Sequence, residues 1–318
     1  MTDKQINGWL RRQFSWVGWI LLLYYGIMTI LVSVTVGVEI AKQSLRSVAA
    51  GDFSGNFNLD KINGNAWGYI AAILLGIAIL AAWKGNIYWK REIFGKEKSM
   101  RAGTFLCFLI FCMGAQMVNI MWLSLLEYLM NLWGSSMVPV LEQVSGSSNT
   151  FTMFLYASIL APLWEELLFR GFILRSLRPF GKRFAVLGSA LLFGLFHGNL
   201  LQAPYALVVG LLLGYLAVEY SIVWSIAVHM FNNLVLADLL SRLTASWSEM
   251  AYGALNLILF GGSALASVIL LVVNRNKIRD YCQREWMDRR CLKCFFTNAG
   301  ILTFMVIMCI SMAIMFFM

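Results

Sequence analysis

Charged residues and prolines are scarce in this chain. Of its 318 residues, 13% are charged and only four are proline, whereas 60% are hydrophobic. A soluble globular domain carries about 25% charged residues, so the composition excludes a soluble domain of this size. The sequence therefore indicates a polytopic membrane protein.

Histidine is scarcer still, and acidic residues are outnumbered by basic ones. The chain has two histidines, and 25 Lys and Arg against 16 Asp and Glu give it a net charge of +9. A nucleic-acid partner requires basic side chains along one helix face or in one patch. Here they are grouped between apolar segments, as membrane topology requires, so we expect no nucleic-acid partner.

Nine apolar runs approach the length of about 20 residues that a helix needs to cross a bilayer. They cover residues 16–38, 66–83, 104–127, 152–174, 184–198, 203–218, 222–240, 251–273 and 300–318. The first run has no small-residue cleavage site after it, so we expect it to be retained as a helix. The sequence predicts an all-α fold, with one membrane domain over residues 1–318 and eight or nine spans.

The distribution of Lys and Arg predicts how these spans are oriented. With the N-terminus inside, the inner connections hold 20 of the 25 basic residues. The outer connections hold four: Lys42, Arg46, Lys61 and Arg242. Because basic loops are retained on the cytoplasmic side, we predict an integral protein of a bacterial cytoplasmic membrane with its N-terminus inside.

The fourth run contains three ionisable residues, Glu165, Glu166 and Arg170. A charged group at the centre of a membrane helix costs at least ~2.5 kcal/mol on insertion scales, so each carboxylate needs a partner. Glu166 and Arg170 are four residues apart, which lets them pair on one helix face. Glu165 points roughly 100° away and has no partner on its own helix.

The two histidines lie in later apolar runs. Counted from the inner surface at ~1.5 Å per residue, Glu165 lies about 15 Å deep and His229 about 12 Å deep, whereas His197 lies about 21 Å deep. Asn233 follows His229 by four residues, so the two share a helix face. We predict that these four side chains meet in a polar cavity below the inner surface, where they would form a hydrolytic set.

Each of these residues also has a purely structural interpretation. The pair of Glu166 with Arg170 can hold a helix together without any chemistry, and a single histidine in a membrane helix commonly packs against its neighbours. Asn232 stands beside Asn233, and either can bridge two helices. Chemistry is favoured because both histidines of the chain fall in the two spans that can face Glu165.

Three motifs follow one another on successive spans: Glu165-Glu166-x-x-x-Arg170, Phe193-x-x-x-His197 and His229-x-x-x-Asn233. In this order and at this spacing they resemble the motifs of the CAAX protease and bacteriocin-processing family of intramembrane proteases, also called Abi proteases. The resemblance covers about residues 150–240, which we take as the catalytic core. The first three spans and the last two carry no matching motif.

The resemblance implies an eight-helix bundle with a cavity open to the cytoplasm, and peptide-bond hydrolysis near the membrane surface. By motif position, Glu165 would activate water together with His197, while His229 and Asn233 would stabilise the oxyanion. The neighbouring Glu-Arg pair would support them. Some members of the family serve as bacteriocin-immunity factors or scaffolds, which is a non-catalytic alternative.

The residues leave two options for a cofactor. Glu165, His197 and His229 could supply three ligands to zinc and leave a fourth position for water. Against zinc, the sequence has no two histidines at four-residue spacing, and no spare acid is left to act as the base. A metal-free mechanism gives every residue a task, so we expect no required cofactor and keep zinc as the alternative.

These expectations combine into one function. We expect an intramembrane endopeptidase that cleaves a membrane-associated peptide or protein near the cytoplasmic face of the lipid bilayer. The rival interpretation is a proton-linked transporter or a non-catalytic partner protein. A transporter would spread charged residues along a path, whereas the predicted depths of Glu165 and His229 agree, which favours the protease.

The orientation can be tested by thiol labelling. In a cysteine-free background, single cysteines at Lys96 and Arg289 should react with an impermeant reagent only after cell lysis, because basic loops stay inside. A cysteine at Ser147 should react in intact cells. Labelling of position 96 in intact cells would reverse the predicted topology.

Overall fold

The structure is a computed structural model that describes residues 2–52, 55–85, 88–93, 95, 97–138, 141, 150–284 and 288–317. Helices make up 85% of the chain, and the described residues contain no strand, so the predicted all-α class is confirmed. Lys96 and Ser147, the labelling positions named above, lie outside the described residues.

The chain forms helices of very different length. Among the described residues before 150, the α-helices are α1 (Asp3–Ala49), α2 (Leu59–Asn63), α3 (Trp67–Trp83) and α4 (Ala102–Asn131). The middle of the chain forms α6 (Phe151–Phe154), α7 (Ala161–Glu166), α8 (Arg175–Leu177), α9 (Lys182–Phe196), α10 (Ala203–Glu219), α11 (Ile222–Met230) and α12 (Leu240–Thr244). The last helices are α13 (Glu249–Asn256), α14 (Gly262–Val273), α15 (Arg275–Arg284), α16 (Arg289–Phe296) and α17 (Ala299–Phe317).

Wider π-helical turns join several of these helices into longer rods. They are η1 (Tyr88–Ile93), η3 (Leu155–Leu160), η4 (Leu167–Leu174), η6 (Phe231–Leu239) and η7 (Leu257–Gly261), and a short 3₁₀ turn, η5 (Arg178–Phe180), follows α8. Two of them, η3 and η4, flank α7, and η6 follows α11 directly. Such turns inside helices are frequent at functional sites, because they displace the side chains from regular spacing.

Every predicted span coincides with a helix, but not every helix has the length of a span. Among the described residues, six helical stretches are long and apolar enough to cross a membrane, and the bent pair of α16 and α17 can make a seventh. The helices α9 and α10 have 15 and 17 residues and fall short. The predicted count of eight or nine spans is therefore not confirmed.

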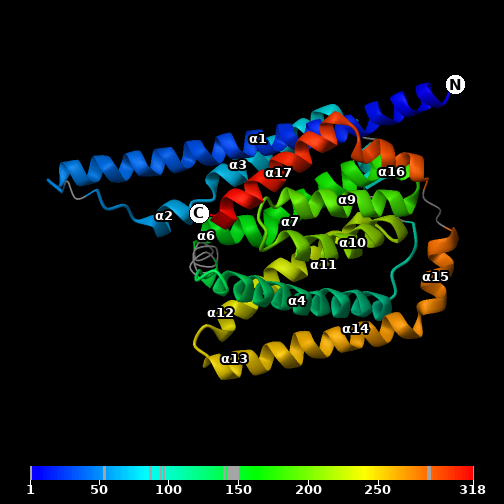
Figure 1. The fold of residues 1–318 in the computed structure, drawn as a ribbon. Helices are drawn as coiled ribbons and strands as arrows, with labels where there is room; N and C mark the ends of the chain where they lie inside the picture. The colour runs from blue at the N-terminus through cyan, green and yellow to red at the C-terminus, as the bar shows by residue number, and fades with distance from the viewer. Residues whose placement is uncertain are drawn as a thin grey trace.

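The two short helices lie inside the bundle. Figure 1 shows the helices running side by side, with α1, α3 and α17 above, α9 and α10 in the middle, and α4, α13 and α14 below. Because neighbouring helices cover α9 and α10, their ends can be satisfied by protein groups rather than by water. A full hydrocarbon-spanning length is therefore not required of them.

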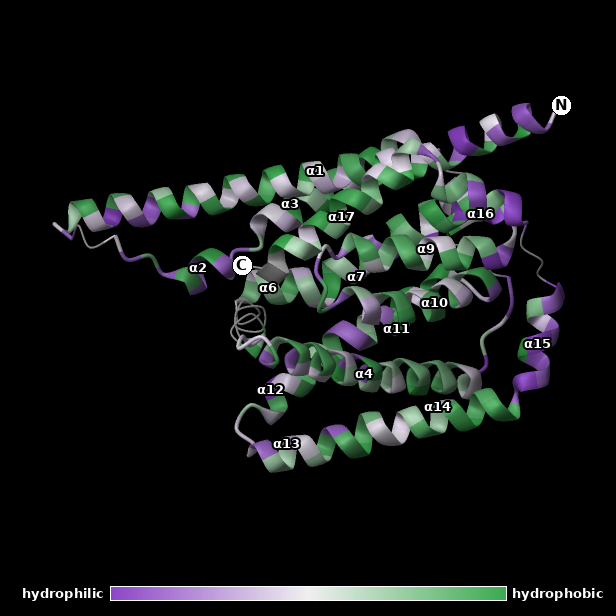
Figure 2. Ribbon diagram, viewed as in Figure 1, coloured by the Kyte–Doolittle hydropathy of each residue, from purple (hydrophilic) through white to green (hydrophobic). Residues whose placement is uncertain are grey.

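One end of the bundle carries the basic loops. It holds the N-terminus, α15 and α16, where Figure 2 shows hydrophilic residues gathered. Glu219 at the end of α10 pairs there with Lys98 and with Lys182, whose Nζ lies 3.1 Å from Glu219 Oε1. The hydrogen bond to Glu219 raises the pKa of Lys98. Arg178 joins this end through a 2.7 Å contact with Glu97.

The last helix belongs to the core of the bundle. The side chains of Ile301, Phe304 and Met308 on α17 are fully buried in the same apolar cluster as the side chains of α1 and α9. Where α17 crosses α1, a Cβ added to Gly18 would lie 2.2 Å from the carbonyl carbon of Gly300. The two backbones touch, as small residues permit between membrane helices.

The crossing of α1 and α17 predicts a sharp size limit at Gly18. Gly18→Leu should lower the free energy of unfolding by about 1–3 kcal/mol or more, because the new side chain overlaps backbone and no rotamer relieves it. Gly26→Leu on the same helix is the matched control, since nothing lies within 4 Å of a Cβ built there. The melting temperatures of both variants are measured by thermal unfolding in detergent. Equal melting temperatures would contradict the close packing of α1 on α17.

Candidate active site

The two adjacent glutamates lie where the fourth predicted span is least regular. Glu165 and Glu166 end α7, between the π-helical turns η3 and η4. Pro162 stands in the first turn of α7 and cannot donate a backbone hydrogen bond. In η4, the carbonyl of Gly171 accepts a hydrogen bond of 2.7 Å from the hydroxyl of Tyr88. The helical backbone is thus widened around the acidic pair, and a side-chain hydroxyl supplies a hydrogen bond to one of its carbonyls.

The ion pair expected from four-residue spacing is present. Arg170 Nη1 lies 2.8 Å from Glu166 Oε1, and both side chains are completely buried. Arg170 also donates from Nη2 to the carbonyl of Gly210 on α10, at 3.1 Å, and its guanidinium carbon lies 4.4 Å from the centre of the Phe193 ring. The arginine therefore connects the acidic helix to α9 and α10.

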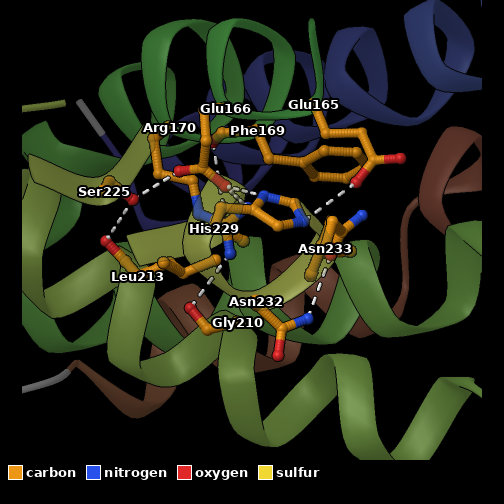
Figure 3. Close-up of polar contacts among 12 residues, drawn as sticks. Glu165, Glu166, Phe169, Arg170, Gly210, Leu213, Ser225, His229, Asn232 and Asn233 are labelled. Atoms are coloured by element: carbon orange, nitrogen blue, oxygen red, sulfur yellow. Dashed lines mark hydrogen bonds and ion pairs between the residues drawn. The ribbon is translucent and has the colours of Figure 1, made fainter. Parts of the chain in front are cut away.

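Glu166 has more partners than the sequence suggested. Its Oε1 lies 2.9 Å from His229 Nδ1, and its Oε2 accepts a hydrogen bond from the Ser225 hydroxyl (Figure 3). Ser225 also lies 3.0 Å from the carbonyl of Leu213. Sequence reasoning missed Ser225, although its position four residues before His229 places it on the same face of α11. The Glu166 carboxylate therefore joins the acidic helical segment to α11.

Glu165 points the other way, into a cavity. Its side chain keeps 18% of its surface exposed, in contrast to the fully buried Glu166. His229 Nε2 lies 3.6 Å from Glu165 Oε2, so the His229 ring stands between the two carboxylates (Figure 3). The side chains of the two adjacent glutamates therefore point in different directions, as the helical geometry predicted.

Asn233 is held by its neighbour. Asn232 Nδ2 donates to Asn233 Oδ1 at 3.0 Å, and Asn233 Nδ2 donates to the carbonyl of Ala157 at 2.9 Å. Asn232 Oδ1 in turn accepts hydrogen bonds from Gln116 and Tyr205. A side-chain amide has two hydrogens, so Asn233 keeps one for a ligand. The sequence favoured Asn233 over Asn232, and the structure joins the two in one chain of hydrogen bonds.

His197 lies on another wall of the same cavity. Its Nδ1 is 2.9 Å from the carbonyl of Phe193, one turn earlier. The Phe193 ring packs edge-on against both histidines, with centroid separations of 5.0 Å to His197 and 5.7 Å to His229. Within the part of the chain that the structure describes, no hydrogen bond or ion pair joins His197 to Glu165. His229 is therefore the direct neighbour of the cavity glutamate.

The cavity unites the predicted residues of all three motifs. It has a volume of about 720 Å³, and Glu165, His197, His229 and Asn233 all line it. Further polar lining comes from Gln116, Asn119, Ser158, Gln202, Tyr205, Asn232, Asp238, Ser241 and Arg242. The volume lies in the range of ligand-binding pockets.

The cavity also has a direction within the bundle. Several lining residues stand at helix ends on the side away from the basic loops: Met153 and Phe154 in α6, Gln202 before α10, and Arg242 and Ala245 at the end of α12. The sequence predicted both a cytoplasmic basic end and a cavity open to the cytoplasm. The fold puts the basic loops and the cavity lining at opposite ends, so these two expectations conflict.

A metal ion does not fit the donor groups that are brought together. Among the described residues, no three His, Cys, Asp or Glu side chains converge as a metal site requires. His229 directs Nδ1 at Glu166 and Nε2 at Glu165, while His197 directs Nδ1 at a carbonyl. The three zinc ligands kept as an alternative are therefore not brought together.

The long apolar helices and the buried charges define an integral membrane protein. Within it, residues 147–235 match the family model described as Type II CAAX prenyl endopeptidase Rce1-like. This confirms the resemblance drawn from the three motifs, and the matched segment contains all of them. Searches of curated proteins and of solved structures found no match.

The buried pair of Glu166 and Arg170 predicts a large stability effect. Glu166→Gln or Arg170→Ala should lower the free energy of unfolding by about 3–5 kcal/mol, because each leaves one charge buried without its partner. Arg242→Ala is the control: Arg242 pairs with Asp238 at 2.9 Å but is 46% exposed, so the loss should stay near 1 kcal/mol or below. Equal melting temperatures for Arg170→Ala and Arg242→Ala would contradict this difference.

Proposed function

We propose that the protein is an intramembrane endopeptidase that hydrolyses peptide bonds with Glu165 as the base. The observation that carries the proposal is the common cavity: Glu165, His197, His229 and Asn233, from three separate helical segments, line one polar space inside an apolar bundle. The match of residues 147–235 to a CAAX endopeptidase family model supports the reaction class. The substrate is a membrane-associated peptide or protein.

Glu165 and His197 activate the water in this mechanism. The carbonyl of Phe193 can only accept a hydrogen bond, so the nitrogen of His197 facing it, Nδ1, carries the proton in the neutral ring. Nε2 is then the acceptor nitrogen, and it can hold one hydrogen of a water molecule. The Glu165 carboxylate takes the other proton as the water oxygen attacks the peptide carbonyl carbon.

His229 and Asn233 stabilise the negative oxygen that forms. The Glu166 carboxylate can only accept, so the His229 Nδ1 that faces it carries a hydrogen; when the ring also binds a proton on Nε2, that nitrogen can donate into the cavity. Asn233 adds its remaining amide hydrogen. Both donors are fixed before substrate arrives, which is the property that makes an oxyanion site effective.

The amine leaving group receives its proton from Glu165. The glutamic acid formed in the first step returns that proton to the departing nitrogen when the tetrahedral intermediate breaks, and the carboxylate is restored. The bond that breaks is the peptide C–N bond, and the water supplies the oxygen of the new carboxyl group. No further co-reactant is required.

The rival functions use the same residues differently. A transporter needs a polar path from one side of the membrane to the other, but η4, which leads from the glutamates toward the basic end, is buried at every residue from Leu167 to Leu174. A scaffold needs Glu166 and Arg170 but gives Glu165, whose side chain faces the cavity, no task. The protease accounts for both glutamates.

Glu165→Gln should abolish peptidase activity while the melting temperature stays near that of the wild type. The change removes a base, and removal of a general base typically costs about 100-fold or more in rate. Glu249→Gln on the exposed start of α13 is the control and should keep full activity. The assay uses purified protein in lipid discs with lipid-anchored fluorogenic peptides.

Two results would count against the mechanism. Full activity of Glu165→Gln would remove the proposed base. Activity that disappears after treatment with a strong chelator and returns with stoichiometric zinc would replace the metal-free mechanism, since three of the four residues could then act as ligands. Retained activity in chelated protein supports the metal-free form.

A further inference from the structure

The cavity lies toward the end of the bundle that is opposite the basic loops. The lining residues of α6, α10 and α12 come from the helix ends opposite the basic loops. In Figure 1 those ends lie beside α2, α13 and the C-terminus, whereas the N-terminus, α15 and α16 lie at the far end. The cavity therefore belongs to one half of the bundle.

The basic end is closed beneath the catalytic residues. Glu166 and Arg170 have no exposed surface, and Ile173, Leu174 and Leu177, which follow them toward the basic end, are also completely buried. Closer to the basic loops, Glu219 forms ion pairs with Lys98 and Lys182. Among the described residues, these side chains form a plug between Glu165 and the basic loops.

The charge distribution says which end faces the cytoplasm. Connections rich in Lys and Arg are retained inside, and of the 20 basic residues in the predicted inner connections, those that the structure describes lie at the closed end. The open end carries Lys42, Arg46, Lys61 and Arg242. Of these, Arg242 is paired with Asp238 at the cavity, so the rim adds no net charge there.

The rim of the cavity mixes polar and apolar side chains. Arg242 lies 5.6 Å above the ring of Phe154, which brings α12 and α6 together at the cavity. Gln202 and Ser241 add neutral polar groups, and Met153 adds an apolar one. A mixed rim of this kind suits a short unfolded segment at the lipid–water boundary, where apolar and polar side chains alternate with exposed backbone.

We infer that the cavity takes its peptide from the non-cytoplasmic face of the membrane. The substrate class is then the outward-facing segment next to the anchor of a membrane-bound or exported peptide, rather than a peptide presented from the cytoplasm. The inference rests on the proposed function only in treating the peptide as a substrate. The side of the membrane from which the cavity is entered is a property of the fold.

Access can be measured without any peptidase assay. In a cysteine-free background of the full chain, Ala237→Cys places a thiol on the cavity wall, Glu249→Cys one at the open end, and Arg275→Cys one at the closed end. Intact cells are treated with a small impermeant thiol reagent, and a second sample is treated after lysis. Ala245→Cys, also on the cavity wall, replaces Ala237→Cys if that variant fails to fold.

The expected result is labelling of positions 237 and 249 in intact cells, and of position 275 only after lysis. The inference is overturned if position 237 is labelled only after lysis together with position 275, or if it stays unlabelled in both samples. Labelling of position 275 but not of position 249 in intact cells overturns it as well, because the closed end would then face outward.

The activity readout separates this inference from the proposed function. If the purified chain hydrolyses peptides, prior labelling of Ala237→Cys in intact cells should reduce the rate at least tenfold by filling the cavity, and labelled Glu249→Cys should keep its rate. If the chain hydrolyses nothing, the endopeptidase proposal fails, while the labelling pattern still reports the side from which the cavity is entered.

Discussion

The Glu166 carboxylate is the interaction on which the polar centre of this bundle depends. A bare carboxylate inside a membrane is too costly to keep, and here the cost is offset by a buried arginine, an imidazole and a hydroxyl on the same two oxygens. Through Arg170 the network reaches a carbonyl of α10, and through Ser225 and His229 it reaches α11. The acidic helical segment, α10 and α11 are thus joined by one network around this charge. His229 obtains its orientation from this network, which leaves its other nitrogen beside Glu165.

The irregular helices follow from the same requirement. A regular α-helix places neighbours at fixed angles, and the π-helical turns η3, η4 and η6 shift that register beside the acidic pair and after His229. The asparagine pair in η6 shows the effect: consecutive residues normally diverge, yet Asn232 hydrogen-bonds Asn233, which reaches back to a carbonyl in η3. The hydrogen bonds that a widened turn leaves open are available to side chains, so the irregular backbone and the polar cavity occur together.

Spacing within one helix was enough to predict part of this site. The pairing of Glu166 with Arg170 and the divergence of Glu165 follow from 3.6 residues per turn, and four-residue spacing placed His229 and Asn233 on the same side. Contacts between helices were beyond that reasoning: nothing in the sequence says that His229 meets Glu166, or that Phe193 packs between the two histidines. Depth was ambiguous for a simple reason. Glu165 lies ten residues from Arg175 and fifteen from Thr150, so counting from one end alone cannot say toward which end the side chain opens. Likewise, apolar length identified the long helices but overestimated α9 and α10, whose burial by other helices relaxes the length rule.

The contact of Gly18 with Gly300 also bears on the order in which the protein is assembled. Translation makes α1 long before α17, so the face of α1 around Gly18 lacks its α17 partner while the helices between them are being made. Lipid or another protein must occupy that face in the meantime. When α17 arrives it displaces this occupant, so the backbone contact of α17 with α1 forms only after the helices between them have been made.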